Sequence, residues 1–161
     1  MLNGESVIYG NYPMIRETLE YDIIQEKNVD YSKFSKEEII THLAKFVSNI
    51  WQVHPFGEGN TRTTAVFLIK YLKTLGFDVT NDLFAENAWY FRNASVRANY
   101  NNVSKQIYET NEYLEMFLKN LLFQEDNKLL NRYLHVDYSK KPDIGAKKPD
   151  IGTKKPDIEL A

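Results

Sequence analysis

Residues 54 to 62 of the sequence, HPFGEGNTR, bring several chemically active side chains together between two apolar segments. His54 has an ordinary pKa of about 6.5, so it is suited to take a proton from a nucleophile near neutral pH. Glu58 offers a carboxylate, Asn60 an amide and Arg62 a guanidinium. A base, an acid and anion-binding donors at this spacing indicate chemistry on a phosphate-containing ligand.

The glycines of this stretch predict a tight loop that ends in an anion site. Gly57 and Gly59 let the backbone fold closely, and Gly59, Asn60 and Thr61 lie at the expected start of the next helix. Unpaired N–H groups and the helix dipole favour an anion at such a start. Arg62 adds a bidentate contact to phosphate oxygens, and Asn60 adds a side-chain amide donor.

Glu58 would repel a phosphate unless a cation lies between them. Mg²⁺ is typically held by one or two carboxylates together with substrate phosphates, so it is the ion that we expect here. Pro55 and Phe56 are interpreted as structural residues, and Phe56 is expected to pin the loop to the core.

The same residues admit a plainer interpretation, a corner between two helices without chemistry. Glu58 and Asn60 would then cap the second helix, Arg62 would be solvated and His54 would be a half-buried histidine with satisfied hydrogen bonds. For any one of these residues the plainer interpretation is the commoner case. The whole set, in this order, favours the phosphate site.

Two helices are expected to position the loop. Ser35 and Glu38 form a capping box, apolar residues follow at helical spacing, and this helix should run to about Val53. The segment after the loop, TAVFLIKYLKTLGF, has so little polar face that we expect a helix buried on most sides. Gly76 is its expected C-terminal cap.

The remaining elements are expected to be mostly helical. β-Branched and aromatic residues around a Gly-Asn pair in residues 5–15 predict a short β-hairpin, and helical spacing begins at about Pro13. Further helices are predicted over 81–100 and 101–124. The predicted fold is therefore all-α with one small hairpin.

The composition restricts the class of protein. The chain has 161 residues, 43% of them hydrophobic, a formal charge of −2 and no cysteine. One domain is expected, with neither disulfides nor cysteine-ligated metals. The absence of a basic surplus disfavours nucleic acid and anionic membranes as partners, and the helix after the loop has too few basic residues for a DNA-binding role. Without a targeting signal or a membrane-length apolar run, we expect a cytoplasmic protein.

The C-terminal segment repeats a seven-residue unit. KKPDIGA, KKPDIGT and KKPDIEL begin at residues 140, 147 and 154. Each unit carries one apolar residue and a proline that breaks helices, which excludes a coiled coil. The predicted organisation is a domain over 1–135 and an extended tail over 136–161.

Residues 54–62 resemble the signature of Fic domains, His-Pro-Phe-x-(Asp/Glu)-Gly-Asn-x-Arg, and the resemblance extends from the predicted hairpin to about Leu122. It implies an all-α Fic fold, a helical bundle around a central buried motif helix with a β-hairpin flap over the site. Such enzymes, including bacterial ones, mostly transfer AMP from ATP to a protein hydroxyl. It thus implies a protein adenylyltransferase that modifies a Ser, Thr or Tyr of a target protein or of itself.

The resemblance also implies a role for each motif residue. His54 would be the general base that acts on the target hydroxyl, and Glu58 would hold Mg²⁺. Gly59 and Asn60 would form the anion hole for the α-phosphate, and Arg62 would bind the outer phosphates. Losing His54 or Arg62 should then be severe, because such transfer depends on positioning and electrostatics.

Two further sets of residues follow from the resemblance. The flap, which would dock an extended target segment by strand addition, corresponds to Val7, Ile8, Tyr9, Gly10 and Asn11. Candidate adenosine contacts are Asn93, Arg97 and Tyr100. An ordinary edge hairpin and a plain amphipathic helix are the open alternatives for these two segments.

The sequence departs from the family pattern in three respects: in the motif, in its regulation, and at its start, where Fic domains usually have one or more helices before the flap. A second arginine often follows the first by three residues, but position 65 is Ala65, and Thr61 replaces a common glycine. No inhibitory (Ser/Thr)-x-x-x-Glu motif occurs, so three interpretations stay open: restraint by a separate antitoxin-like chain, loss of the restraining segment, or an unrestrained protein. A homo-oligomer is the other expected partner, because it would cover exposed apolar surface. The alternatives to AMP transfer are transfer of UMP or a phosphoryl group, and a catalytically weak module that binds nucleotide or protein.

Overall fold

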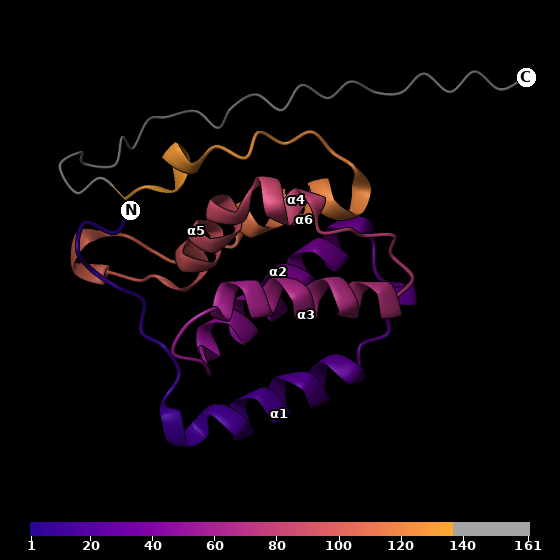
Figure 1. Ribbon diagram of the computed structural model, residues 1–161, viewed down its shortest axis with the longest axis horizontal. Helices are drawn as coiled ribbons and strands as arrows, with labels where there is room; N and C mark the ends of the chain where they lie inside the picture. The colour runs from indigo at the N-terminus through magenta and orange to yellow at the C-terminus, as the bar shows by residue number, and fades with distance from the viewer. Residues whose placement is uncertain (137–161) are drawn as a thin grey trace, which may run out of the picture.

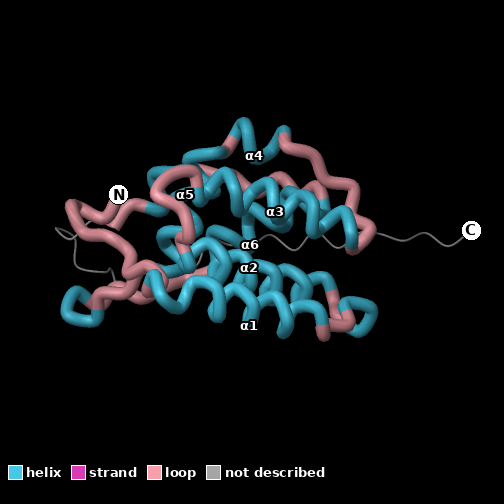
Figure 2. The backbone as a smooth tube through the Cα atoms, turned by 60° about the horizontal axis from the view of Figure 1, so that its bottom comes forward, coloured by secondary structure: helices cyan, strands magenta, loops and turns pink. Residues whose placement is uncertain are grey.

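A computed structural model describes residues 1–136 of the chain, and within them the fold is built from helices without a β-strand (Figures 1 and 2). The all-α prediction is confirmed for this part of the chain. The predicted KKPDI tail lies outside the described residues, apart from Val136. The α-helices are α1 (Ile15–Lys27), α2 (Lys36–Val53), α3 (Asn60–Thr74), α4 (Asp82–Glu86), α5 (Ala88–Asn99) and α6 (Glu112–Phe123). Short 3₁₀ turns cover Tyr12–Met14, Tyr31–Lys33, Val103–Lys105 and Asn131–Leu134.

Helix α2 is the centre of the bundle, because it packs against α1, α3, α5 and α6. Figures 1 and 2 show α1 on one side of it and α4 and α5 on the other. The capping box is confirmed: the Ser35 hydroxyl accepts from the Glu38 N–H at 3.3 Å, and the Ser35 N–H donates to the Glu38 carboxylate at 2.8 Å. The helix ends at Val53, as predicted, because His54 turns into the left-handed region with a φ of 51°.

Helix α3 begins at Asn60 because Gly59 takes a φ of 80°. Gly76, with a φ of 88°, follows its end and matches the predicted cap. The prediction that this helix is buried on most sides is wrong, since Val66 is 52% exposed. Only one face is buried, and it contributes Ala65, Leu68 and Leu72 to the main hydrophobic core.

The predicted hairpin in residues 5–15 is absent from the described structure, and that prediction is wrong. The segment before Tyr12 is extended, but its backbone pairs with the end of α2 rather than with a second strand. The Gly10 N–H donates to the Gln52 carbonyl, and Gln52 Nε2 donates to the Ile8 carbonyl, both at 3.1 Å. After Asn11 the chain turns directly into a helix that carries Pro13 in its first turn, which leaves no room for a returning strand.

The second half of the domain has shorter helices than predicted. The expected helix over 81–100 is divided at Asn87, whose φ of −121° interrupts it. The expected helix over 101–124 begins only at Glu112. Before it, the Asn102 side chain caps a 3₁₀ turn and Gln106 takes a φ of 56°, so local side-chain bonds outcompete the helix.

The hydrophobic core has two parts. The larger lies between α2, α3, α5 and α6 and includes the fully buried Leu43, Leu68, Phe91 and Phe117. The smaller joins the N-terminal segment to the end of α2 and to α5 through Leu2, Val7, Trp51, Val96 and Tyr100. This second cluster holds residues 1–10 beside the loop that follows α2.

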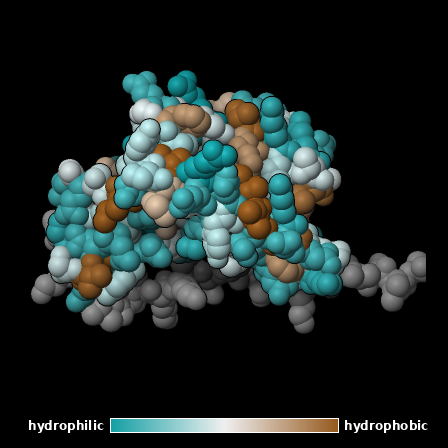
Figure 3. Space-filling model, turned by 90° about the horizontal axis from the view of Figure 1, so that it is seen from below, coloured by the Kyte–Doolittle hydropathy of each residue, from teal (hydrophilic) through white to brown (hydrophobic). Residues whose placement is uncertain are grey.

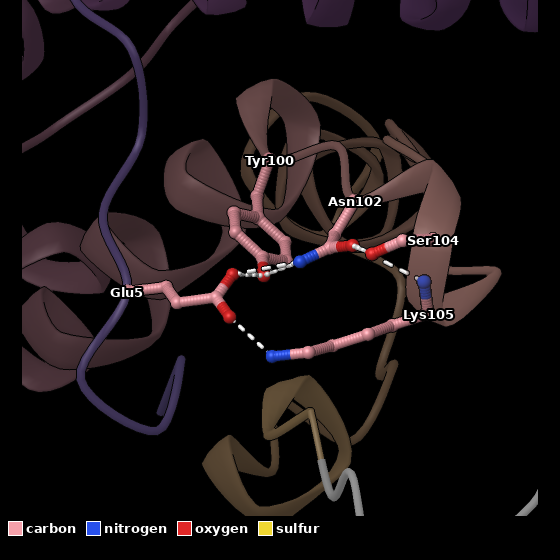
Figure 4. A network of polar contacts seen from close by, with 5 residues as sticks. All are labelled: Glu5, Tyr100, Asn102, Ser104 and Lys105. Atoms are coloured by element: carbon pink, nitrogen blue, oxygen red, sulfur yellow. Dashed lines mark hydrogen bonds and ion pairs between the residues drawn. The ribbon is translucent and has the colours of Figure 1, made fainter.

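A polar network fixes the same N-terminal segment from its other side. Glu5 accepts hydrogen bonds from the Tyr100 hydroxyl, from Asn102 Nδ2 at 2.9 Å and from the Lys105 ammonium (Figure 4). These contacts, first the one with Lys105, lower the pKa of Glu5 to about 2. The segment is therefore tied at Glu5 and at Gly10, on either side of Tyr9.

The surface on the side of α1 is mostly hydrophilic, with hydrophobic side chains in separate patches (Figure 3). None of the described helices combines the length and apolar character that crossing a bilayer requires. Phe56 is 51% exposed, so the prediction that it pins the loop to the core is wrong. It lines an apolar groove beside α1 instead.

Candidate active site

The loop between α2 and α3 is closed by the side chain of Asn60. Its Nδ2 donates to the Phe56 carbonyl at 2.6 Å, and its Oδ1 accepts from the Phe56 N–H at 2.9 Å. Asn60 is buried although Phe56 is exposed, so the amide side of both bonds is removed from water. The amide donor that the sequence analysis expects for an anion is thus bonded within the loop, and Asn60 acts on the site by shaping it.

A second bond ties the end of α2 to the start of α3. Trp51 is fully buried, and its indole Nε1 donates to the Thr61 hydroxyl at 3.0 Å. Because a buried indole N–H needs an acceptor, this pair favours the register that brings the N-terminus of α3 beside the end of α2. The hydroxyl of Thr61 can still donate its own proton to a ligand.

The motif residues line a pocket of about 270 Å³. The predicted residues that the structure brings together there are His54, Glu58, Gly59, Asn60, Thr61 and Arg62. Three residues outside the motif complete the lining, Tyr9, Trp51 and Arg92. Gly57 belongs to the same loop but does not line the pocket.

His54 lies against two aromatic rings. Its imidazole stacks on Tyr9, with ring centroids 3.9 Å apart and planes at 29°, and Trp51 meets it edge-on at 5.4 Å. Nδ1 is buried. Proton exchange with a ligand therefore falls to Nε2.

The pKa of His54 is lowered from its ordinary 6.5. Burial is the main cause, and the positive charge of Arg92 lowers it further, while the backbone of Trp51 acts in the opposite direction. The neutral imidazole is the form that accepts a proton. The neutral imidazole of His54 therefore persists to lower pH than that of an ordinary histidine.

Arg62 lies in the first turn of α3 and folds back over Gly59. Its Nη2 is 3.6 Å from where a Cβ would stand on Gly59, so the glycine leaves space beside the guanidinium. Within residues 1–136, Arg62 has neither an ion pair nor a hydrogen bond from its side chain. The start of α3 and the unpaired guanidinium of Arg62 thus border the same pocket.

Glu58 is exposed and is likewise unpaired among the described residues. No group of three or more metal-ligating side chains occurs in that part of the chain, so no site made of protein ligands alone is present. A single carboxylate in a pocket with an anion site fits Mg²⁺, which takes most of its other ligands from water and phosphates. The donor set suits an ion that enters with a phosphate ligand.

The three candidate nucleotide contacts predicted on and after α5 do not line this pocket. Asn93 is buried, donates to Asn131 Oδ1 at 2.9 Å and accepts from Arg92 Nη1 at 3.2 Å. Tyr100 is buried and bonds to Glu5, and Arg97 is half-buried beside the loop before α6. Asn93 and Tyr100 hold parts of the fold together through their side chains, and Arg97 does so through its backbone carbonyl, which accepts from the Thr110 N–H at 3.1 Å.

Helix α5 contributes Arg92 to the pocket instead, a residue that the sequence analysis misses. Arg92 is exposed, and α5 buries Tyr90, Phe91, Asn93 and Ala94 around it. In the sequence it looks like an ordinary charge on the solvent face of a helix. Only the packing of α5 beside the motif loop shows that it faces the pocket.

The five predicted flap residues lie beside the pocket as an extended segment, with different surroundings. Val7 is buried, Ile8 is 85% exposed and Tyr9 covers one face of His54. A Cβ on Gly10 would stand 3.1 Å from the Val53 carbonyl oxygen, so this close approach requires glycine. Asn11 precedes the turn at Tyr12–Met14.

Two further cavities border the pocket. One of about 240 Å³ lies along the N-terminal segment and shares Tyr9 and Arg92 with it. The other, of about 320 Å³, lies between α3, α4 and α5 and shares Thr61 and Arg62. Its remaining lining is mostly apolar and comprises Ala65, Val66, Asn81, Phe84, Ala85, Ala88 and Phe91.

Comparison with known proteins gives one match. A model of the Fic/DOC family matches residues 5–72, which span the N-terminal segment, α1, α2, the motif loop and most of α3. No curated protein and no solved structure matches the chain. The matched range contains the motif residues of the pocket, whereas Arg92 lies beyond it.

Proposed function

Residues 5–72 identify the chain as a Fic-domain protein, and from that premise we propose that it is a Fic-type transferase that moves AMP from Mg-ATP to a hydroxyl of a target protein or of itself. The target hydroxyl belongs to a Ser, Thr or Tyr side chain. The observation that carries the proposal is the convergence of His54, Glu58 and Arg62 on one pocket, beside the N-terminus of α3.

The base and the anion-binding groups support a transfer reaction over simple binding. A nucleotide-binding module needs the charge of Arg62 and the amides of α3, but it does not need a neutral histidine. His54 has a lowered pKa, and its buried Nδ1 leaves Nε2 for the ligand. A pocket arranged in this way suits deprotonation of a hydroxyl next to a phosphate.

The transfer step assigns a task to each of these groups. Nε2 of His54 takes the proton from the target hydroxyl as its oxygen bonds to the α-phosphorus. The bond from that phosphorus to the oxygen that bridges to the β-phosphate breaks, and pyrophosphate leaves. Arg62 and the N-terminal amides of α3 stabilise the charge that gathers on the phosphate oxygens. The loop bonds of Asn60 hold these donors in place before the ligand arrives.

Glu58 is the residue that would hold Mg²⁺. When bound, the ion would neutralise part of the phosphate charge and orient the phosphate chain. Glu58 is exposed and has no partner among the described residues, so no bond within the fold must break for it to bind the ion.

The apolar cavity beside Arg62 supports a nucleoside as the group attached to the phosphates. Its walls include two aromatic rings, Phe84 and Phe91, and its volume of about 320 Å³ lies in the usual range for small-ligand sites. It continues from the phosphate pocket through Thr61 and Arg62. Apolar walls favour a base without fixing which one it is.

The decisive experiment compares the label positions of ATP. The purified full chain is incubated with Mg²⁺ and either α-labelled or γ-labelled ATP, alone and with a bacterial lysate. AMP transfer is expected to label protein from α-labelled ATP only, and His54→Ala is expected to abolish it. His135→Ala, which changes an exposed histidine outside the pocket, is the matched control and should retain labelling.

The other outcomes separate the alternatives. Label from γ-labelled ATP alone would replace AMP transfer with phosphoryl transfer, and label from α-labelled UTP alone would indicate UMP transfer. No protein label from any of these nucleotides, with nucleotide binding intact in calorimetry, would overturn the transferase proposal in favour of a binding module.

A further inference from the structure

Arg92 brings a second guanidinium to the pocket from an element that the motif does not include. It lies on α5, in the part of the chain that follows the family match. It lines the pocket together with His54, Glu58 and Arg62. Two arginines from separate helices therefore border one cavity of about 270 Å³.

The fold holds the Arg92 side chain in place without neutralising its charge. The guanidinium lies over the exposed ring of Trp89, 5.7 Å from the ring centre, and Nη1 donates to Asn93 Oδ1 at 3.2 Å. Neither partner is a carboxylate, and none of the ion pairs among residues 1–136 includes Arg92. A stacked guanidinium keeps donors free for a further partner.

The charges around the pocket favour a ligand with several negative charges. Two arginines, Arg62 and Arg92, line the pocket together with a single carboxylate, that of Glu58. The lowered pKa of His54 favours its neutral form. A guanidinium presents donors in a fork that matches phosphate oxygens, so each arginine can serve a different phosphate. Helix α3 supplies only one arginine to the pocket, Arg62. At position 65, where the family pattern often has a second arginine, the buried Ala65 lines the neighbouring apolar cavity.

The two arginines also border the pocket on different sides. Arg62 is shared with the cavity between α3, α4 and α5, and Arg92 with the cavity along the N-terminal segment. A chain of two or three phosphates can extend from one of these arginines towards the other, so each guanidinium can bind a different phosphate.

We propose that Arg92 is a second phosphate-binding residue of this pocket, which with Arg62 selects a nucleoside di- or triphosphate over a monophosphate. The inference rests on the proposed function for the identity of the site, but it concerns binding and can be tested without any transfer. It assigns to α5 a contact with the phosphate chain rather than with the nucleoside.

The test is calorimetric binding of inorganic tripolyphosphate, Mg-ATP and AMP to the full chain. Arg92→Ala is expected to weaken tripolyphosphate and Mg-ATP binding by about tenfold or more, as expected for losing charge-assisted hydrogen bonds, and AMP binding much less. Arg92→Lys keeps the charge but loses the fork, so its loss should be smaller.

Arg132→Ala is the matched control, because Arg132 is also exposed and stacks on an aromatic ring, Tyr133, but does not line the pocket. It should bind all three ligands as the wild type does. Thermal unfolding of both alanine variants verifies that each is folded. Trp89→Ala removes the ring under Arg92 and should weaken tripolyphosphate binding in the same direction.

The remaining outcomes separate this inference from the proposed function. Unchanged tripolyphosphate and Mg-ATP binding by folded Arg92→Ala would overturn the inference even if wild-type protein transfers AMP. An equal loss for AMP and ATP would overturn it too, as would a wild-type protein that binds none of the three ligands. A selective loss in a protein that transfers no label would support Arg92 while the proposed function fails.

Discussion

Two polar clusters of this fold use similar residue types in opposite ways. In the first, the Glu26 carboxyl at the end of α1 accepts hydrogen bonds from the hydroxyls of Tyr31 and Tyr71 and pairs with His42 Nε2 at 2.6 Å. Glu26 is only 5% exposed. One buried carboxyl thus joins α1, the 3₁₀ turn after it, α2 and α3.

The motif pocket also holds a carboxylate, a histidine and cationic or hydroxyl donors, but there they do not pair with one another. Glu58 and Arg62 have no partner among the described residues, and His54 contacts rings rather than a carboxylate. A cluster whose polar groups satisfy one another stabilises a fold, whereas exposed, unpaired charges around a pocket leave their donors and acceptors available to a ligand.

The pKa shifts follow the same division. Burial, followed by the bond to Glu26, raises the pKa of Tyr31 and Tyr71 well above the usual value, which keeps both hydroxyls protonated as donors. Burial and the charge of Arg92 lower the pKa of His54 instead. The first environment fixes protons in place, and the second leaves a site ready to accept one.

Among the variants that compare the two clusters, Arg62→Ala should have the largest effect. Loss of its guanidinium is expected to lower transfer activity by about 10²–10³-fold, because charge on the transferred phosphate loses a fixed donor. The thermal midpoint should stay unchanged, since Arg62 is exposed and unpaired within residues 1–136. Labelling rates and thermal unfolding of the same sample measure the two effects. A large fall in stability would show that the pocket is a structural cluster after all.

The opposite pattern is expected for Glu26→Ala. Two half-buried tyrosine hydroxyls and the His42 ring lose their buried partner, so the free energy of unfolding should fall by about 3 kcal/mol. Urea unfolding measures it, and Glu26→Gln, which keeps an acceptor oxygen, should lose less. The folded fraction of the Glu26→Ala protein should bind phosphate ligands as the wild type does. A fall of less than about 0.5 kcal/mol in the alanine variant is the usual size for a surface substitution. It would show that the Glu26 cluster does not stabilise the fold.

Asn60→Ala tests the residue that belongs to both kinds of cluster. It lies in the motif, yet both groups of its amide are bonded to Phe56. Removing two part-buried hydrogen bonds should lower the free energy of unfolding by about 2 kcal/mol. It should reduce transfer as well, because the loop that carries Glu58 is no longer held closed. Urea unfolding and labelling are measured together. An activity loss without a stability loss would instead mean that the amide serves the ligand.

Short-range patterns account for the parts of the fold that the sequence predicts well. The capping box at Ser35, the end of α2 at Val53 and the glycine after α3 each depend on residues within a few positions. The motif residues of the pocket lie together for the same reason. They all belong to one short loop, which the Asn60 side chain closes, and to the first turn of α3. Local chemistry is enough to place such elements.

Long-range packing explains the failures. The strand-forming residues Val7, Ile8 and Tyr9 do form an extended segment, but it pairs with the carbonyl of Gln52 and the ring of His54. Nothing near these residues in the sequence indicates that partner. Arg92 was missed in the same way, because its place in the pocket depends on how α5 packs beside the motif loop.

The smallest effect should come from Tyr9→Ala, which removes the ring stacked on His54. Burial is the main cause of the low pKa of His54, so the exposed imidazole should titrate closer to 6.5. The base must be neutral, and therefore the acid limb of kcat/KM should move to higher pH. The wild-type fold loses stability as pH falls from 6.5 towards the lowered pKa of His54, because the unfolded chain binds the proton first. That loss of stability should be smaller in the Tyr9→Ala variant.

NMR titration of the imidazole measures the pKa directly, with Tyr12→Ala, an exposed tyrosine outside the pocket, as the control. An unchanged His54 pKa would mean that Trp51 and Arg92 set the environment of the base without the N-terminal segment.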